Sequence, residues 1–343
     1  MKLTRRGKLT LFAAAPAGLA LLVAGAAYAY LDAIGVVGAS RPGPTTTVVI
    51  PHGATLSDAG EILEEKGIVP SALGFRLRVR LDGVSGVEAG RYVLHKNLSA
   101  ADALAALGRG PEVRYETVTF PEGSTVKDFA ATLQRETRLS ARDFLAAVKS
   151  GSVRSRIQPP GVTSLEGLLF PSTYQVSEND SARTVLARFV ETFDEQFSKL
   201  DLTTAKKAGL TPYEVVIVAS MVEEEAKVPA DRGKVARVVY NRLEQGMPLG
   251  IDATIQYALG KQGESLTVSD LEADSPYNTR IHTGLPPTPI GSPGMASLRA
   301  GAHPPTGDWL YYVVSDCKGH HAFSTDYSDF LVDKEHYQSL SCG

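Results

Sequence analysis

Three consecutive carboxylates, Glu223, Glu224 and Glu225, close the segment YEVVIVASMVEEEAKV at 213–228. The residues before them are apolar on every side of a helix, a pattern typical of a helix enclosed in a core. At about 100° per residue, three successive acids point in three directions, so water cannot surround all of them if the helix body is buried. Desolvation raises the pKa of a carboxyl group, which suits a general acid that works near neutral pH. The alternative is a last helical turn that passes into a charged surface beside basic neighbours.

Other chemistries find less support in the sequence. The adjacent pair His320-His321 would point to opposite faces of a strand, and no HExxH or Cys/His spacing is present. A G-x-S-x-G elbow, a phosphate loop and a dinucleotide fingerprint are also lacking. We therefore expect no metal and no cofactor. The formal net charge is −3 and no dense basic cluster occurs, which argues against a nucleic-acid partner.

The elements that would position the three acids follow from local patterns. Thr211-Pro212-Tyr213-Glu214 is a capping box with proline at the first helical position, so a helix should begin there. Helical patterns follow at 230–246 and 252–260, and each ends near a glycine. The stretch 275–294 is too rich in Pro and Gly for regular structure, and long loops inside compact domains are usually functional. Strand-like runs at 309–315 and 320–325 complete an expected α+β architecture.

The N-terminal half contains an internal repeat. TVVIPHGATLSDAGEIL at 47–63 aligns without gaps on TVTFPEGSTVKDFAATL at 117–133, and NLSAADALAAL at 97–107 is a fainter echo. Each main copy reads as a strand, a Pro-x-Gly turn, a capping Thr and an amphipathic helix. This unit resembles the LysM carbohydrate-binding module. The alternative is a common folding solution that has no affinity for sugar.

The first residues predict a membrane anchor. Lys2, Arg5, Arg6 and Lys8 precede an uncharged run over 9–31, which as a helix would span about 34 Å against a hydrocarbon core of roughly 30 Å. The positive-inside rule then gives a cytoplasmic N-terminus at 1–8 and an extracytoplasmic remainder, in a single-pass protein of the cell membrane. The alternative is a cleaved signal peptide, because Ala27-Tyr28-Ala29 resembles a cleavage site.

The expected organisation after the anchor has three parts. A linker covers 32–47, a LysM-like subdomain 48–135 and a mixed α+β catalytic domain 136–343. Cys317 and Cys342 are the two cysteines. In an oxidising compartment they could form one disulfide, and two unpaired thiols are the alternative.

Several ordered motifs together resemble the endolytic murein transglycosylases of the MltG (YceG-like) family. They are SLEGLLFPSTY, ASMVEEEAKVPADRGKVARVVYNRLEQGMPLGIDATIQYALG, SPYNTRIHTGLPPTPIGSPGMASLRAGAHP and GHHAFS. The resemblance implies non-hydrolytic cleavage of the β-1,4 bond between N-acetylmuramic acid and N-acetylglucosamine, which leaves a 1,6-anhydromuramoyl end. It also implies that growing peptidoglycan strands are the substrate and that cell-wall synthases are partners.

The resemblance also implies roles for individual residues. The catalytic acid of the family motif S-[IVM]-V-E-x-E maps onto Glu223, and Glu225 is then the second motif acid. A lytic transglycosylase needs no water, so one glutamate can protonate the leaving oxygen and then accept the proton of the attacking 6-hydroxyl. Further substrate contacts are expected from residues of the matched motifs: Glu166, Glu225, Asn241, Gln256, Tyr277 and Asn278.

Some of these assignments have alternatives. Asn241 could equally be a buried amide that binds backbone, and Glu166 a structural partner of an arginine or the backbone. LGIDATI stands where an LQSDPTV-like run is more usual, and Ser172 where aspartate is common, so individual groove contacts can differ. The alternative function is that of a non-catalytic peptidoglycan-binding or scaffold protein of the cell-wall synthesis machinery.

Overall fold

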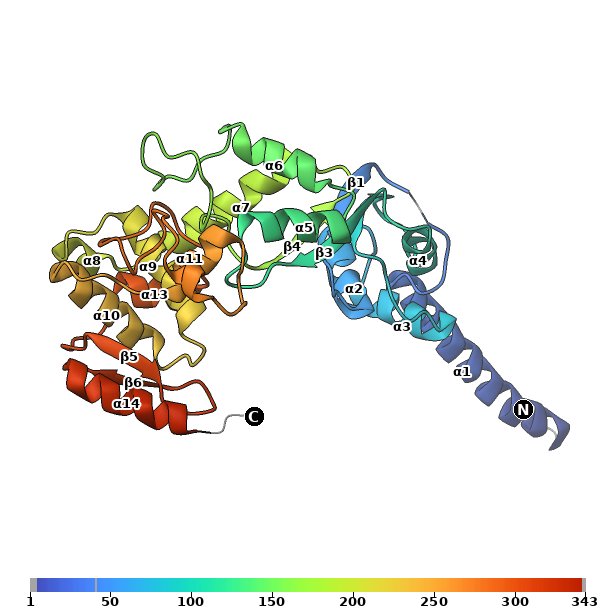
Figure 1. Ribbon diagram of the computed structural model, residues 1–343. Coiled ribbons are helices and arrows are strands. Elements are labelled where there is room, and N and C mark those ends of the chain that lie inside the picture. Colours follow the sequence, from blue (N-terminus) through green and yellow to red (C-terminus); the bar gives the residue numbers. More distant parts are fainter. Residues whose placement is uncertain (1–4, 41, 341–343) are drawn as a thin grey trace. The chain divides into compact units, whose positions relative to one another are not determined.

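The computed structural model describes residues 5–40 and 42–340, and its chain divides into two compact units (Figure 1). The first unit comprises Met1–Thr117 and Ser177–Asn179, and the second comprises Val118–Val176 and Asp180–Gly343. Both units combine helices with short strands. The expected α+β class is confirmed.

The first unit is built on a pair of antiparallel strands, which are connected through two helices. β1 (Thr45–Ile50) pairs with β2 (Gly90–His95) so that Thr45 faces His95, and Gly90 and Arg91 pair with the start of β3 (Val113–Thr119). Three helices pack here: α2 (Leu56–Glu65), α3 (Ala72–Asp82) and α4 (Ala100–Gly108). Alternate residues of the strands face a small core, as the two-residue period of a strand requires.

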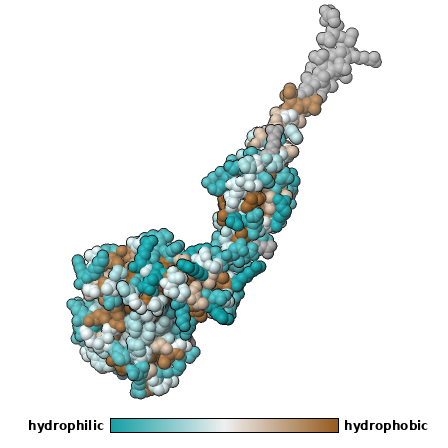
Figure 2. Space-filling view, turned by 90° about the horizontal axis from the view of Figure 1, so that it is seen from above, coloured by the Kyte–Doolittle hydropathy of each residue, from teal (hydrophilic) through white to brown (hydrophobic). Residues whose placement is uncertain are grey.

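The helix at the N-terminus, α1, spans Arg5–Ala33 and covers the segment where the sequence predicts a membrane anchor. Leu19, Leu21, Leu22 and Val23 are between 61% and 74% exposed, and Figure 2 shows hydrophobic surface on this helix. Among the described residues, no helix combines the length and the apolar character that crossing a membrane requires. The anchor therefore stays a prediction, and residues 1–4 of the predicted cytoplasmic N-terminus lie outside the described part.

The internal repeat corresponds to a repeated local structure. Thr55 caps α2 in a capping box with Asp58, and Thr125 caps α5 (Val126–Glu136) in the same way with Asp128. The turns before them hold Gly53 and Gly123 at φ values of 76° and 80°, a region that favours glycine. The predicted strand, turn, cap and helix are confirmed in both copies. A LysM-like function is not tested by this local likeness.

The second unit holds most of the helices. Its elements after α5 are α6 (Ala141–Lys149), β4 (Thr173–Ser177), α7 (Ala182–Phe197), α8 (Thr203–Lys207), α9 (Pro212–Glu225), α10 (Arg232–Glu244), α11 (Asp252–Leu259), α12 (Val268–Leu271), α13 (Met295–Ala302), β5 (Tyr311–Val314), β6 (His321–Ser324) and α14 (Tyr327–Ser339). β5 and β6 form an antiparallel hairpin with Tyr312 opposite Phe323. The segment between α12 and α13 contains no helix and no strand, as predicted.

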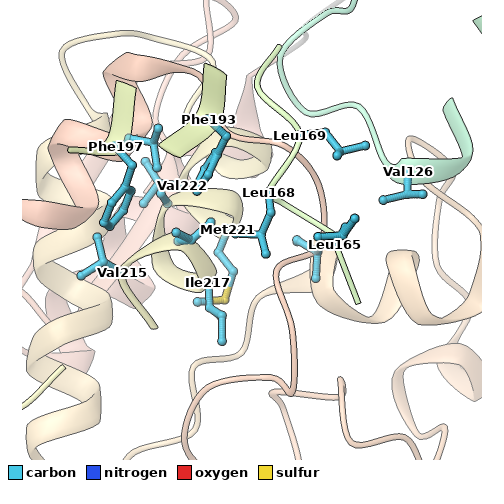
Figure 3. Close-up of a cluster of buried hydrophobic side chains, with 14 of the residues drawn as sticks. Val126, Leu165, Leu168, Leu169, Phe193, Phe197, Val215, Ile217, Met221 and Val222 are labelled. Atoms are coloured by element: carbon cyan, nitrogen blue, oxygen red, sulfur yellow. The ribbon is translucent and has the colours of Figure 1, made fainter. Parts of the chain in front are cut away.

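The division between the units falls earlier than the predicted subdomain boundary at 135. The ring of Phe120 stacks on Phe129 at 4.5 Å and meets Phe189 of α7 at 4.9 Å. The second copy of the repeat therefore shares its core with the helices that follow it. Figure 3 shows part of that core, where Val126 lies near Leu165 and the side chains of α9 pack beside Phe193 and Phe197.

The helix that carries the three acids is enclosed as the sequence predicts. α9 begins with the Thr211 capping box and has buried side chains from Tyr213 through Val222. Its partner α13 approaches closely, since a Cβ placed on Gly301 would lie 3.1 Å from the carbonyl oxygen of Val215. The hydroxyl of Ser220 also accepts the N–H of Ile290 at 3.1 Å, which ties the loop before α13 to α9.

The structure describes one of the two cysteines. Cys317 is disulfide-bonded, so the alternative of an unpaired thiol is wrong for this residue. Cys342 lies outside the described residues.

Candidate active site

The three carboxylates at the end of α9 reach three different surroundings. Glu223 accepts the backbone N–H of Gly294 at 2.8 Å, and its other oxygen lies 3.4 Å from the guanidinium of Arg232. Glu225 accepts the hydroxyl proton of Tyr312 at 3.1 Å. The carboxylate of Glu224 lies against Gly123 in the turn before α5. The divergence predicted from helical geometry is therefore present.

Three carboxylates of the candidate set share one structural feature: each binds a free N–H at the start of a helix. Glu223 binds Gly294 at the start of α13, Glu225 binds Ala253 in the first turn of α11, and Glu166 binds Val126 at the start of α5. The first N–H groups of a helix have no partner within it, and the helix dipole favours negative charge there. α11 and α13 have no side-chain cap of their own, so these acids satisfy them from elsewhere in the chain.

Glu225 lines two cavities near the end of α9. A cavity of about 590 Å³ is lined by Glu225 together with Asp252, Arg280, Tyr312 and other side chains of the β5–β6 hairpin and α14. A second cavity of about 230 Å³, bordered by Lys227 among others, also has Glu225 in its wall. Val314 and His321 line both cavities as well, so the two cavities are neighbours.

The surroundings of Glu225 favour its protonated form. Burial raises the pKa of the Glu225 carboxyl, and the charge of Asp252 adds to the rise. The hydrogen bond from Tyr312, the charge of Arg280 and the N–H of Ala253 oppose it. Glu225 therefore keeps its proton to a higher pH than an exposed glutamate does.

Glu223 is held by ionic and backbone contacts and is not among the residues that line these two cavities. Its side chain is 8% exposed and that of Arg232 is 16% exposed. Arg232 is held in turn by the hydroxyl of Ser297 in the first turn of α13, at 3.2 Å. These contacts join the end of α9 and the start of α10 to the start of α13.

Glu122 lies beside this pair and was not identified from the sequence. Its carboxylate sits over Gly294, where any Cβ would overlap it. Burial and the charge of Glu223 raise the pKa of Glu122, while Arg232 opposes the rise. The available signal was its place in the Pro-x-Gly turn of the second repeat, but only the fold brings that turn to α9. Gly123 donates its N–H to Ser292 at 2.8 Å and so fixes the turn against the loop.

Glu166 is buried inside the second unit. It accepts the N–H of Val126 at 3.0 Å and the hydroxyl proton of Tyr257 at 3.1 Å. Burial raises its pKa to about 7 despite these bonds. The ring of Tyr257 lies 5.3 Å from that of Tyr277, whose hydroxyl bonds that of Thr288 at 2.7 Å. Of the alternatives from the sequence, backbone binding by Glu166 is what the structure contains.

The other predicted contact residues use their side chains within the protein. Asn241 donates to the carbonyl oxygens of Gly307 and Trp309 at 3.0 and 2.8 Å. Gln256 donates to the carbonyl of Glu264 at 2.6 Å. Asn278 is fully buried and donates to two carbonyls just after α12. None of the three lines the two cavities beside Glu225, so their predicted role in binding substrate stays a prediction.

His321 and Asp231 form a further polar pair at the site. Asp231 precedes α10 but does not cap it, and instead accepts the backbone N–H of His321 at 2.8 Å and contacts its ring at 3.2 Å. The ring of His321 meets that of Tyr312 edge-on at 5.4 Å, which supports the donor to Glu225. Within the described ranges, no group of three or more His, Cys, Asp or Glu side chains is arranged to hold a metal ion.

Comparison with known proteins gives a consistent result. Residues 48–336 match the model of the YceG-like family. An endolytic murein transglycosylase of Bacillus subtilis is 32% identical over 308 residues, with 86% of this chain and 85% of that protein covered. One from Streptococcus pneumoniae R6 is 31% identical over 343 residues, and here the chain spans 62% of that longer protein. The crystal structure of a yceG-like protein from Listeria monocytogenes matches 84% of this chain and 99% of its own, with 29% identity and a TM-score of 0.57.

Proposed function

The chain belongs to the YceG-like family, and on that basis we propose that it is an endolytic murein transglycosylase. The proposed reaction cleaves the β-1,4 bond between N-acetylmuramic acid and N-acetylglucosamine in peptidoglycan and leaves a 1,6-anhydromuramoyl end. The observation that carries the proposal is the enclosed helix α9, which ends in the two motif acids Glu223 and Glu225, the second of which lines two cavities.

We propose that Glu223 has the acid and base role. In its protonated form Glu223 gives a proton to the leaving O4 of N-acetylglucosamine while the C1–O4 bond breaks. The 6-hydroxyl oxygen of the muramic acid attacks C1, and the Glu223 carboxylate takes its proton. No water is consumed, so the second carboxylate that a hydrolase uses to activate water is not required.

The family motif supports this assignment, because its first glutamate maps onto Glu223. In the structure Glu223 is held by Arg232 and by the N–H of Gly294, which restricts the orientation of the carboxyl group. Glu225 borders two cavities, and Tyr312 donates a hydrogen bond to it. We propose that Glu225 contacts the substrate, and the two roles can be separated by substitution.

The two cavities beside Glu225 support cleavage inside a strand rather than at its end. A chain of sugars that passes from one cavity into the other would place an internal bond near the end of α9, which carries both motif acids. Enclosure on a single side would favour a strand terminus. We therefore expect products of intermediate length from the start of digestion.

The test of the function is digestion of purified, undigested glycan strands by the whole protein, with products read by mass and by length. We expect anhydromuramoyl ends and an early fall in mean strand length. Reducing muramic acid ends would indicate hydrolysis instead. Strand binding without any cleavage would support the alternative, a non-catalytic peptidoglycan-binding or scaffold protein.

The proposed setting is the outer face of the cell membrane, next to the synthases that extend the strands. The exposed apolar residues Leu19, Leu21, Leu22 and Val23 of α1 support an anchor. An anchored enzyme would meet strands as they are made, which fits the termination of elongation. The partner synthases are proposed on this ground alone.

A further inference from the structure

Part of the wall of the 590 Å³ cavity is a cluster of three aromatic rings that the catalytic proposal does not use. Tyr311 of β5 lies 5.4 Å from Tyr327 and 5.5 Å from Phe330, and the last two, both on α14, stack at 5.6 Å. We call these three residues the aromatic platform. Because the rings support one another, the platform is rigid without any bound partner.

The platform is open to solvent. Tyr327 is 56% exposed, and Lys334, one turn further along α14, is also exposed on the same cavity. No side chain of α14 is buried, so packing alone does not explain why this helix carries two aromatic residues toward the cavity. An exposed aromatic face in a concave site is suited to a ligand that has an apolar face of its own.

Charged groups lie around the platform in the same cavity. The guanidinium of Arg242 lies over the ring of Tyr311 at 5.4 Å, and three carbonyl oxygens accept its hydrogen bonds. Arg280 pairs with Asp252, whose side chains are 40% and 47% exposed. A paired arginine and aspartate offer donors and acceptors side by side, as neighbouring hydroxyls of a sugar require.

We propose that the aromatic platform, with Arg280 and Asp252, is a binding subsite for one pyranose ring of the glycan strand. The apolar C–H face of the sugar would stack on Tyr327, and its hydroxyl groups would meet the ion pair. The proposal rests on the proposed function, because the same cavity is lined by Glu225, which lies two residues after the proposed catalyst Glu223. Binding energy from a sugar held here would help to position the strand.

The test measures binding of undigested glycan strands to the whole protein in a Glu223→Gln background, which prevents turnover. Tyr327→Ala should weaken binding on the order of tenfold, the effect of losing one stacked ring. Tyr327→Phe keeps the ring and should bind as the parent does. The matched control is Val332→Ala, since Val332 is 66% exposed on the same helix but does not line the cavity.

Equal binding by the Tyr327→Ala and Val332→Ala proteins would overturn the subsite, provided that circular dichroism shows both folded. Loss of binding by Tyr327→Phe as well would also contradict stacking, since the ring is retained. This binding measurement does not depend on whether the protein cleaves the strand. If the wild-type protein cleaves nothing and Tyr327→Ala still weakens binding, the proposed function fails while the subsite stands.

Discussion

The neighbouring acids Glu223 and Glu225 differ mainly in what surrounds them. Two residues apart on a helix, they point about 200° apart, so one joins the ends of three helices and the other borders the cavities. The sequence predicted that the acids diverge and that burial would perturb them. It could not predict which one meets open space, because the β5–β6 hairpin and the loop before α13 come from distant parts of the chain.

The hydrogen bond from Tyr312 gives a prediction about the protonation of Glu225. Burial raises the pKa of Glu225, and the Tyr312 hydroxyl opposes the rise because it stabilises the charged carboxylate. Tyr312→Phe should therefore raise the pKa of Glu225 further. Titration of the Glu225 carboxyl carbon by NMR checks this. A pKa that stays in place or falls would contradict the hydrogen bond.

Glu166 gives a prediction about stability. Its pKa in the folded protein is about 7, raised from 4.5 by burial. Because the pKa of Glu166 is raised in the folded protein, its contribution to stability is complete below the pKa of the unfolded chain. That contribution is lost as pH rises through about 7. The glutamine of the Glu166→Gln protein does not titrate. The difference in free energy of unfolding between this variant and wild type should therefore shift in favour of the variant by roughly 2–3 kcal/mol between pH 5 and pH 8.

The measurement for Glu166 is thermal or urea unfolding at both pH values. The exposed Glu272→Gln protein is the control and should follow wild type at each pH. A difference between Glu166→Gln and wild type that is the same at pH 5 and pH 8 would show that Glu166 does not titrate in this range.

At the scale of elements, α9 is positioned by its cap and by its contact with α13. The cap was predictable because its two residues, Thr211 and Glu214, are only three positions apart in the sequence. The repeated strand, turn and cap were predictable because they too depend on residues that are close in the sequence. α14 was not predicted, since it has no buried face and therefore no apolar periodicity. The place of Glu122 beside Gly294 was not predictable either, because it depends on a contact between distant segments.

The close approach of α13 to α9 can be tested at Gly301. Its added Cβ would meet the backbone of Val215 and Ala219 at 3.1 and 3.2 Å, with little room for displacement. Gly301→Val should therefore destabilise the second unit by about 1–3 kcal/mol, the usual range for overpacking. Calorimetric unfolding checks this, with Gly108→Val as control, since nothing lies within 4 Å of a Cβ at Gly108. Equal losses in both proteins would contradict the tight helix contact.

At the scale of the whole molecule, the proposed role depends on where the second unit works. The apolar residues Leu19, Leu21, Leu22 and Val23 of α1 are exposed, and contiguous exposed apolar surface commonly marks a membrane or protein contact. We expect the full chain to remain in the membrane fraction after an alkaline carbonate wash. A version in which those four residues are changed to serine should be released. Release of the unchanged chain would contradict the anchor.

The account depends most on the assignment of Glu223 as the acid and base. The direct measurement is the rate at which anhydromuramoyl ends form from glycan strands with the wild-type, Glu223→Gln and Glu225→Gln proteins, each shown to be folded. General acid and base catalysis is typically worth about 10²–10⁴-fold, so Glu223→Gln should lose at least that much, while Glu225→Gln should keep measurable cleavage. Full loss with Glu225→Gln and retained cleavage with Glu223→Gln would contradict the assignment.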